Sequence, residues 1–372
     1  MTGLRRTTRE APPDARVEAV LAGSDGTDGT DGSSGGTDGS GRSDGSGGSD
    51  GSGSGGSDGS DGSGSGGSAA ERVEARVAAV VVNHDAGDAL LGCVASVRAA
   101  GVRELVVVDN SSSDGSLERL AAVDVGVVVP TGRNLGYGRA ANRGVARTRS
   151  ELVLICNPDL VVGPGAVAAL VDALDAAPDV AIAGPLLRNP DGSRYPSARS
   201  FPSLAVAAGH ALGGLVAPGN RWSRRYKMAD RLAELDRSGS LPSAPIAVDW
   251  VSGACVLVRR VAFDAIGGFD ERYFMYAEDV DLCWRLGRAS WGARYVPAAE
   301  VVHAQGLSTA KHPVRMIVAH HASAWRFARV STSGPARFAL PLTAGALALR
   351  LALALLAQLG ARTGRSGSPS TG

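Results

Sequence analysis

The sequence predicts an α/β domain with a mainly parallel central sheet. Short apolar runs alternate with helix-like patterns, and the loops between them are brief. The first run, residues 77–82, contains only valine and alanine, as expected for a strand that is buried on both faces of a parallel sheet. The alternation extends over residues 76–184, so one ordered domain is expected to begin near residue 71.

The other elements follow from the same patterns. Further apolar runs predict strands at 105–108, 125–129, 152–155 and 180–184. Helical spacing predicts helices between these strands, at 89–100, 116–121, 137–147 and 166–177. After a stretch rich in Pro, Ser, Arg and Gly at 189–247, which is predicted to form a substrate loop with short helices, we expect a strand at 255–258 and helices at 261–266 and 278–286.

The two ends of the chain are expected to lie outside this domain. Residues 1–22 have no apolar core long enough for a secretory signal. Residues 23–70 form a Gly/Ser/Asp-rich low-complexity tract that cannot bury apolar surface and is predicted to be disordered. Residues 331–372 are predicted to form an apolar helix and a tail.

The C-terminal apolar segment, residues 338–359, is long enough to span a membrane. Arg350 lies inside it, and an arginine at the centre of a span costs about 2.5–3.5 kcal/mol. Three placements therefore stay open at this point: a helix on the membrane surface, a spanning helix, and a helix packed on the domain.

Composition excludes several classes of protein. Lys+Arg number 38 against 37 Asp+Glu, so there is no excess of positive charge for a nucleic-acid binder. The four cysteines stand singly, without a CxxC pair, which argues against a zinc ribbon and against a disulfide framework. The first predicted strand runs into Asn83 without a GxGxxG motif, which excludes a Rossmann oxidoreductase.

Polar residues follow four successive predicted strands, at the sheet edge where α/β proteins bind ligands. Asp109 can accept a hydrogen bond from a pyrimidine N–H, Arg133 can offset diphosphate charge, and Asp159 can bind a divalent ion that bridges two phosphates. Taken singly, each residue is better explained by a turn or a helix cap, and it is the joint pattern that favours a binding site. The candidates for this nucleotide and diphosphate site are Asn83, Asp109, Asn110, Ser112, Asp114, Arg133, Asn134, Asn157 and Asp159.

A second constellation, at residues 267–285, places five carboxylates among aromatic residues. One of them can serve as a general base in a partly apolar cleft. The alternative is that Glu278 and Asp279 only favour the N-terminus of a helix. His303, after an apolar pair, is either a structural histidine or a ligand that completes the metal shell of Asp159.

The motifs VVVDNSSSDGS, GRNLGYGRAANRG, NPD, WVSGACVLVRR and GGFDERYFMYAEDVDLCWR, followed by a histidine, resemble those of inverting family 2 glycosyltransferases with the GT-A fold. The resemblance covers residues 76–329. It implies a domain at 71–330, with a nucleotide-binding half at 71–188 and an acceptor and catalytic half at 189–330. Within the family, the motifs are most similar to those of enzymes that add L-rhamnose to N-acetylglucosaminyl (GlcNAc)-diphospho-polyprenol, in the arabinogalactan linkage unit of cell walls.

The resemblance also implies roles for single residues. Asp109 reads the nucleotide base, and Asp279, with Glu278 beside it, is the catalytic base. Asn157 stands where the family's DxD motif has its first Asp, so the binding of Mg²⁺ or Mn²⁺ rests on Asp159 and His303. The implied acceptor-side residues are Trp250, Gly253, Asp281, Trp284 and Arg285.

The implied reaction moves L-rhamnose from dTDP-L-rhamnose to the GlcNAc lipid with inversion, at the cytoplasmic face of the plasma membrane. Arginines near 222–225 and Arg337 are expected at lipid headgroups, or else on a solvated basic face. One alternative is a UDP-sugar donor, such as UDP-galactofuranose or UDP-GlcNAc, with another acceptor. Another is a nucleotide-sugar-binding protein without turnover, against which the intact pair of Glu278 and Asp279 argues.

Overall fold

The computed structural model describes residues 68–120, 123, 125–201, 244–304 and 312–365, and the statements below concern these residues. The described residues all belong to one compact unit. The predictions for segment 1–22, for most of the tract at 23–70 and for the arginines at 222–225 lie outside the described residues.

Helix α2 (Ala69–Arg76) begins slightly before the predicted start of the domain. Hydrogen bonds at its N-terminus explain this start. The Ser68 hydroxyl accepts a hydrogen bond from the Glu71 N–H at 3.3 Å, and the Glu71 carboxylate accepts one from the Ser68 N–H at 2.6 Å. This reciprocal capping box satisfies two N–H groups that would otherwise be unpaired at the helix start.

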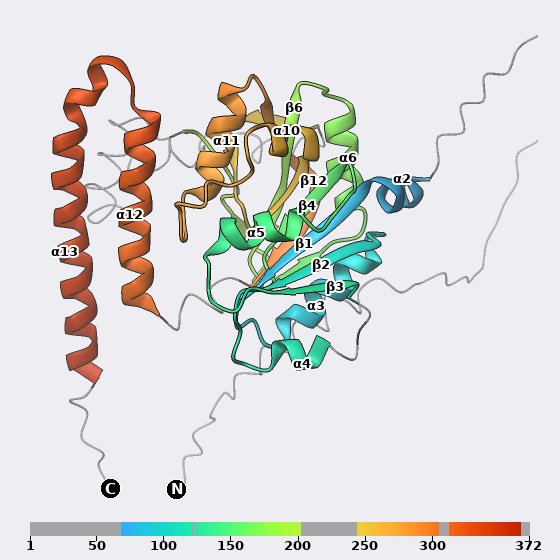
Figure 1. Cartoon of the computed structure of the whole chain (residues 1–372), viewed down its shortest axis with the longest axis horizontal. Coiled ribbons are helices and arrows are strands. Elements are labelled where there is room, and N and C mark those ends of the chain that lie inside the picture. The colour runs from blue at the N-terminus through green and yellow to red at the C-terminus, as the bar shows by residue number, and fades with distance from the viewer. Residues whose placement is uncertain (1–67, 121–122, 124, 202–243, 305–311, 366–372) are drawn as a thin grey trace, which may run out of the picture. The chain divides into compact units, whose positions relative to one another are not determined.

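A mixed ten-stranded sheet forms the centre of the domain (Figure 1). Its strands are β1 (Val77–Asn83), β2 (Glu104–Asp109), β3 (Val127–Pro130), β4 (Leu152–Cys156), β5 (Leu160–Val162), β6 (Val180–Arg188), β7 (Arg194–Tyr195), β9 (Ile246–Val248), β11 (Cys255–Arg259) and β12 (Gly292–His303). The main order is β3-β2-β1-β4-β11-β6-β12-β5, with β7 beside β6 and β9 beside β12. Strands β8 (Ala198–Arg199) and β10 (Trp250–Val251) form a separate antiparallel pair.

The predicted fold class, an α/β domain with a mainly parallel sheet, is confirmed. Strands β1 to β4 are parallel neighbours. Strand β11 lies between β4 and β6 and runs antiparallel to both. Strand β6 and its parallel neighbour β12 therefore run in the same direction as β1 to β4. The carboxyl ends of most strands therefore lie on one side of the sheet.

Helices cover both faces of the sheet, which explains why the strand sequences are continuously apolar. The helices are α3 (Ala89–Ala99), α4 (Ser116–Leu120), α5 (Tyr137–Val145), α6 (Ala166–Asp175), α10 (Arg260–Ala265) and α11 (Glu278–Arg288). Val77, Ala79 and Val81 of β1 pack in one core cluster with α3 and α6. Val80 and Val82 pack in the other cluster, with α5, α10 and α11.

Several elements were not expected from the sequence. Strand β12 pairs with β6 through a register shift between Val296 and Glu300, which interrupts the apolar alternation there.

Two further helices follow β12, α12 (Pro313–Ser331) and α13 (Leu340–Arg365), and a short 3-10 helix (Gly334–Ala339) joins them. Helix α13 confirms the expected C-terminal helix, whereas α12 was not predicted. Strands β7, β8 and β9 occupy the ends of the irregular stretch 189–247, and residues 202–243 within it lie outside the described residues.

Helix α5 crosses the sheet closely enough to require a glycine. A Cβ atom at Gly144 would overlap Val80 Cγ1 and lie 2.7 Å from Val108 Cγ2. We expect Gly144→Ala to lower the free energy of unfolding by about 1–3 kcal/mol, as overpacked cores do. Gly287→Ala in α11, where no described atom lies within 4 Å, is the control and is expected to be neutral or stabilising by up to about 1 kcal/mol. Denaturant unfolding measures both, and equal effects would contradict the prediction.

Candidate active site

The ends of β1 and β2 form a buried polar network. Asn83 and Asp109 are partners in the parallel register. Asn83 Nδ2 donates to Asp109 Oδ1 at 3.0 Å and lies 2.9 Å from the hydroxyl oxygens of Ser112 and Ser116. The Ser112 hydroxyl donates to Asp109 Oδ1 at 2.5 Å. The carboxylate of Asp109 is thereby fixed at the carboxyl edge of the sheet.

Asn110 joins this edge to the loop 131–136. Its Nδ2 donates to Asn134 Oδ1 at 3.1 Å, and its Oδ1 accepts from the Leu135 N–H at 2.8 Å. Arg133 is exposed on the same loop. The structure therefore brings Asn83, Asp109, Asn110, Ser112 and Asn134 together, as the sequence led us to expect.

Asp114, another candidate for the donor site, is held by backbone N–H groups. Its carboxylate accepts hydrogen bonds from the N–H groups of Gly87 at 2.7 Å and Ser116 at 3.0 Å. Burial raises the pKa of Asp114, but the hydrogen bonds from Ser116 and Gly87 outweigh burial and leave the pKa below its usual value. These contacts agree with the alternative that Asp114 holds the start of α4, and its contact with a donor stays a prediction.

The loop 131–136 also contacts the segment that precedes α11. Gly136 has φ +87°, and a Cβ there would overlap the carbonyl oxygen of Phe274. That carbonyl accepts a hydrogen bond from the Tyr137 N–H at 3.1 Å, and the Tyr137 hydroxyl donates to the Gly253 carbonyl at 2.6 Å. Glycine and tyrosine at these positions thus connect the strand-end network to the second constellation.

Strand β12 brings His303 beside the turn that follows β4, opposite Leu160 of β5. The Nε2 atom of His303 lies 3.2 Å from Asp159 Oδ1 and 3.1 Å from Asn157 Nδ2. Asp159 Oδ1 and His303 Nδ1 are buried and have no hydrogen-bond partner among the described residues. Asn157 and Asp159, at the predicted DxD position, are therefore adjacent to His303. The buried Asp159 Oδ1 is left without a hydrogen bond from the described residues.

The segment before α11 has a strained backbone. Tyr276 and Ala277 both have left-handed conformations, with φ 68° and 61°. For residues other than glycine, such conformations cost of order 1–3 kcal/mol each and occur preferentially at functional sites. The turn places Glu278 and Asp279 in the first turn of α11, where the partial positive charge of the helix N-terminus favours carboxylates.

Asp279 is held by backbone N–H groups on both carboxylate oxygens. Its Oδ2 accepts from the Gly253 N–H and its Oδ1 from the Val280 N–H, both at 2.9 Å. A Cβ at Gly253 would lie 2.9 Å from Asp279 Cβ, so this approach needs a glycine. Burial raises the pKa of Asp279 above its usual value, while the two N–H groups and the positive charge of Arg199 limit the rise.

Glu278, unlike Asp279, is not hydrogen-bonded through both of its carboxylate oxygens within the part of the chain that the structure describes. It is 7% exposed, and its Oε2 has no hydrogen-bond partner among the described residues. Burial, and then the negative charge of Asp279, raise the pKa of Glu278 to about 8. Burial raises the pKa of both neighbouring carboxyl groups, but only Asp279 has two backbone N–H partners that oppose the rise. Such differences between neighbouring carboxyl groups are common in acid–base sites.

The raised pKa of Glu278 predicts a pH-dependent gain in stability for Glu278→Gln. A folded pKa of about 8 against an ordinary 4.5 means that the folded protein binds the proton more tightly than the unfolded chain does. The stability of the wild type therefore falls as pH rises from 4.5 towards 8. Glutamine does not titrate, so the variant is expected to gain more than about 1.4 kcal/mol over wild type between these limits.

Thermal unfolding across this pH range measures the gain. Glu271→Gln, at an exposed carboxylate that pairs with Arg139, is the control and should show a pH-independent offset. A Glu278→Gln curve parallel to that of the wild type would contradict the assignment.

The predicted acceptor-side residues fall into two groups. Trp250 lies in β10, where its Nε1 donates to the Ser200 carbonyl at 3.1 Å and Arg199 Cζ lies 5.1 Å from its ring centroid. Trp284 is half-buried on α11, with Arg288 Cζ 5.5 Å from its ring. Gly253, whose N–H donates to Asp279, follows β10 by two residues and so lies close in sequence to Trp250.

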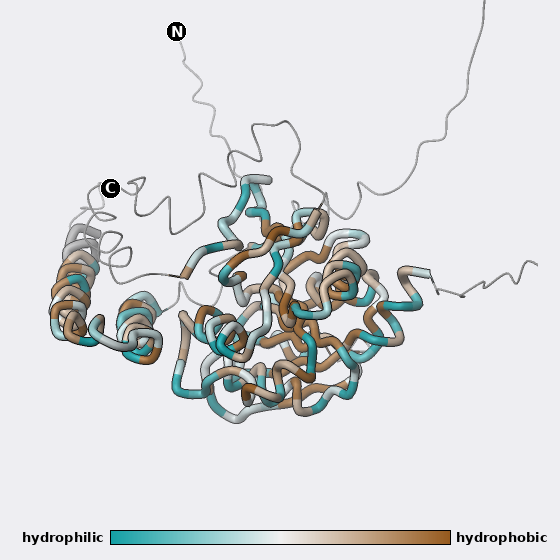
Figure 2. Tube along the Cα trace, turned by 90° about the horizontal axis from the view of Figure 1, so that it is seen from above, coloured by the Kyte–Doolittle hydropathy of each residue, from teal (hydrophilic) through white to brown (hydrophobic). Residues whose placement is uncertain are grey.

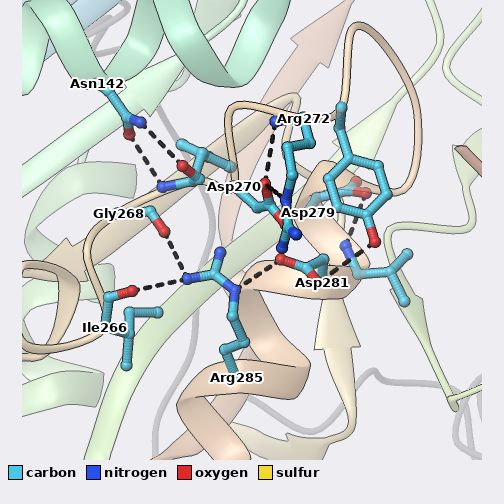
Figure 3. A network of polar contacts seen from close by, with 11 residues as sticks. Asn142, Ile266, Gly268, Asp270, Arg272, Asp279, Asp281 and Arg285 are labelled. Carbon is cyan, nitrogen blue, oxygen red and sulfur yellow. Dashed lines mark hydrogen bonds and ion pairs between the residues drawn. The ribbon is translucent and has the colours of Figure 1, made fainter. Parts of the chain in front are cut away.

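Asp281 and Arg285 instead form an internal network (Figure 3). Arg285 Nε donates to Asp281 Oδ2 at 2.6 Å across one helical turn. Arg285 Nη1 donates to the carbonyl oxygens of Ile266 at 3.0 Å and Gly268 at 2.7 Å. These contacts tie α11 to the loop that follows α10. They differ from the expected contact with an acceptor, which stays untested.

Some residues at the site were not predicted. Tyr137 lies in the motif GRNLGYGRAANRG, but its partner Gly253 is 116 residues away, and nothing in the sequence indicates their contact. Arg199 lies in β8, next to Trp250 of β10 in the antiparallel register. Arg199 precedes Trp250 by 51 residues, and nothing in the sequence indicates their contact.

Comparison with known proteins gives the family. Glycosyl transferase family 2 matches residues 78–266, and glycosyl transferase family group 2 matches residues 200–362. The chain is 42% identical over 286 residues to the N-acetylglucosaminyl-diphospho-decaprenol L-rhamnosyltransferase of Mycobacterium tuberculosis, covering 73% of this chain and 90% of that protein. It is 26% identical over 217 residues to the low-salt glycan biosynthesis hexosyltransferase Agl10 of Haloferax volcanii, covering 56% of this chain and 61% of that protein.

The solved structures that are similar to this chain include the mannosyltransferase PcManGT from Pyrobaculum calidifontis in complex with GDP-Man and Mn²⁺. It is 18% identical, with a TM-score of 0.48, and the match covers 79% of this chain and 76% of that chain. The matched family region includes β1 to β4, the turn with Asp159, and β11. The family match over residues 78–266 and the 90% coverage of the mycobacterial relative establish that the chain belongs to glycosyl transferase family 2.

Proposed function

We propose that the chain transfers L-rhamnose from dTDP-L-rhamnose to a GlcNAc-diphospho-polyprenol, with inversion at the anomeric carbon. The observation that carries the reaction type is the carboxylate of Asp279, to which the Gly253 N–H donates at 2.9 Å, next to the buried Glu278. The identity of 42% with the mycobacterial L-rhamnosyltransferase supports the sugar and the acceptor.

In the proposed single displacement, Asp279 takes the proton from an acceptor hydroxyl of the GlcNAc unit. The resulting oxygen nucleophile attacks the anomeric carbon of the rhamnose, and the bond between that carbon and the diphosphate oxygen breaks. The electron pair of the broken bond leaves with dTDP. Attack from the face opposite the leaving group converts a β-linked donor into an α-L-rhamnoside. Glu278 stays neutral and adds no second negative charge beside the base.

The donor is proposed to bind along the strand ends. The buried carboxylate of Asp109, fixed by Asn83 and Ser112, is an acceptor for the ring N–H of thymine. Arg133, exposed on the neighbouring loop, is proposed to offset the charge of the diphosphate. Trp250 and Trp284 are proposed on the acceptor side, and Asp281 and Arg285 are proposed to position the loop that they hold.

The chain's residues fit a divalent metal ion at Asp159 and His303. The fit rests on the buried Asp159 Oδ1, which has no hydrogen-bond partner among the described residues, and on the imidazole nitrogen 3.2 Å away. Within the described ranges, no group of three or more His, Cys, Asp and Glu gathers, so donor phosphate oxygens would complete the coordination shell. When bound, Mg²⁺ or Mn²⁺ supplies Lewis-acid stabilisation of the leaving diphosphate.

A transfer assay tests the proposed reaction. The purified full chain is given GlcNAc-diphospho-polyprenol and, separately, labelled dTDP-L-rhamnose, UDP-galactofuranose or UDP-GlcNAc. We expect transfer from dTDP-L-rhamnose alone, and an α-anomeric product by NMR. Transfer from a UDP-sugar alone would refute the rhamnose donor while retaining the role of Asp279. Donor binding without transfer would support the non-catalytic alternative.

We further propose that α13 binds the membrane that holds the lipid acceptor, at its cytoplasmic face. Residues Gly334–Leu359 form a helical segment long and apolar enough to cross a membrane, and 18 consecutive residues of it reach a mean hydropathy of 1.9 (Figure 2). The four described cysteines are all free, as is typical of proteins in a reducing compartment. Four leucines at helical spacing form one exposed stripe along α13, here called the leucine stripe: Leu342, Leu349, Leu353 and Leu356.

Charges placed in the leucine stripe are expected to release the protein from membranes. The double variant Leu349→Glu with Leu353→Glu should lower the vesicle-bound fraction at least tenfold, because each buried leucine contributes about 1.5–3 kcal/mol. Co-sedimentation with vesicles that contain anionic lipid measures this fraction. Val261→Glu, at a 67% exposed apolar residue of α10, is the control and should bind as wild type does. Unchanged binding of the double variant would refute the leucine stripe as the contact.

A further inference from the structure

We infer that helix α12 positions the catalytic carboxylates, through the contact between the Ser323 hydroxyl and the segment 273–277. This inference rests on the proposed function, because it concerns the same carboxylates. It makes Ser323 a positioning residue that acts through the backbone before α11.

The contact of Ser323 is buried and bridges distant parts of the chain. Ser323 is 5% exposed, and its hydroxyl donates to the carbonyl oxygen of Met275 at 2.8 Å. The next two residues, Tyr276 and Ala277, are those with left-handed backbones. Such a conformation persists only where the surrounding structure enforces it. The hydrogen bond from Ser323 fixes the peptide directly before the strained turn.

Helix α12 contacts each of four consecutive residues of this segment. Besides the bond to Met275, three ring contacts occur. Arg326 Cζ lies 5.7 Å from the ring centroid of Tyr273, and Arg315 Cζ lies 4.5 Å from that of Phe274. The rings of His320 and Tyr276 are 5.5 Å apart. One helix therefore supports the whole segment from Tyr273 to Tyr276.

The other side of the segment contacts the catalytic helix and α5. The Tyr273 hydroxyl donates to Asp281 Oδ1 at 3.3 Å, and the Phe274 carbonyl accepts from the Tyr137 N–H at 3.1 Å. A shift of the segment away from α12 would move the start of α11. It would thereby change the approach of Asp279 to the Gly253 N–H. Loss of the Ser323 hydroxyl is therefore expected to affect turnover more than substrate binding.

Kinetics of the full-length variants test this inference. Ser323→Ala is expected to lower kcat about tenfold, with the KM values for donor and acceptor within twofold of wild type. Ser331→Ala is the matched control, because the Ser331 hydroxyl donates to the Phe327 carbonyl within α12 itself. Ser323→Thr retains a hydroxyl and should restore most of the turnover. A kcat of Ser323→Ala equal to that of Ser331→Ala would overturn the inference.

Hydrogen exchange gives a readout that does not depend on the sugar. Peptides that cover residues 273–281 should exchange at least tenfold faster in Ser323→Ala than in wild type or Ser331→Ala. If the wild type uses another donor, kcat is compared with that donor, so failure of the proposed function leaves this test intact. Unchanged exchange would overturn the inference.

A second pair of variants serves if Ser323→Ala does not fold. Arg326→Gln removes the cation over Tyr273. Arg329→Gln, whose guanidinium lies 5.9 Å from Trp325 on the same helix, is its control. Lower kcat and faster exchange in Arg326→Gln alone would support the inference, and equal behaviour of the two variants would overturn it.

Discussion

Asp279→Asn is expected to lower kcat by about 10³-fold, within the range of about 10²–10⁴ that general bases contribute. Asparagine retains the shape and can still accept from the Gly253 N–H through its amide oxygen, but it cannot take a proton from the acceptor. Donor affinity, measured by calorimetry, should stay within twofold. Glu271→Gln, at an exposed carboxylate of the preceding loop, is the control and should keep wild-type turnover. An Asp279→Asn variant with more than a tenth of wild-type kcat would refute the base.

The pH profile of kcat/KM belongs to the same prediction. The base must be ionised, so activity should fall with decreasing pH through the pKa of Asp279, which burial raises above its usual value. A second inflection is expected near pH 8, where Glu278 ionises beside Asp279. Glu278→Gln should remove that second inflection and retain the first.

Removal of the divalent metal is expected to lower kcat/KM by about 10²–10³-fold, because charge on the leaving diphosphate then loses its main stabilisation. A chelator should suppress the wild type, and Mg²⁺ or Mn²⁺ should restore it. Asp159→Asn should need at least tenfold more metal for half-maximal rate, since it removes the charged ligand beside His303. Asp191→Asn, at an exposed carboxylate, is the control. Full activity in the presence of chelator would refute the metal site.

The sequence was sufficient for six strands of the central sheet, β1, β2, β3, β4, β6 and β11. Val77 to Val82 are all buried because helices cover both faces of β1, and this double burial produces the continuous apolar run that predicts the strand. Strand β12 escaped prediction because its pairing shifts register between Val296 and Glu300. Helix α12 escaped because arginines and histidines interrupt its apolar residues, and only part of its surface reaches the core.

The site could be predicted as far as it depends on strand ends and motifs. Asn83 and Asp109 follow from the rule that ligands bind beyond the carboxyl ends of strands, and Asp279 follows from the family resemblance. Ser323 and Tyr137 could not be predicted, because their partners lie 48 and 116 residues away. The pair of Asp281 and Arg285 has the spacing of one helical turn, so their mutual contact was accessible from the sequence.

The bond between Tyr137 N–H and the Phe274 carbonyl has a consequence for loop exchange between relatives. The loop around Gly136 and the segment around Phe274 fit together without room for a side chain at Gly136. A chimera that takes only one of them from a relative risks a steric overlap or an unsatisfied carbonyl. The two stretches, 132–138 and 269–277, therefore have to be exchanged together, as one unit.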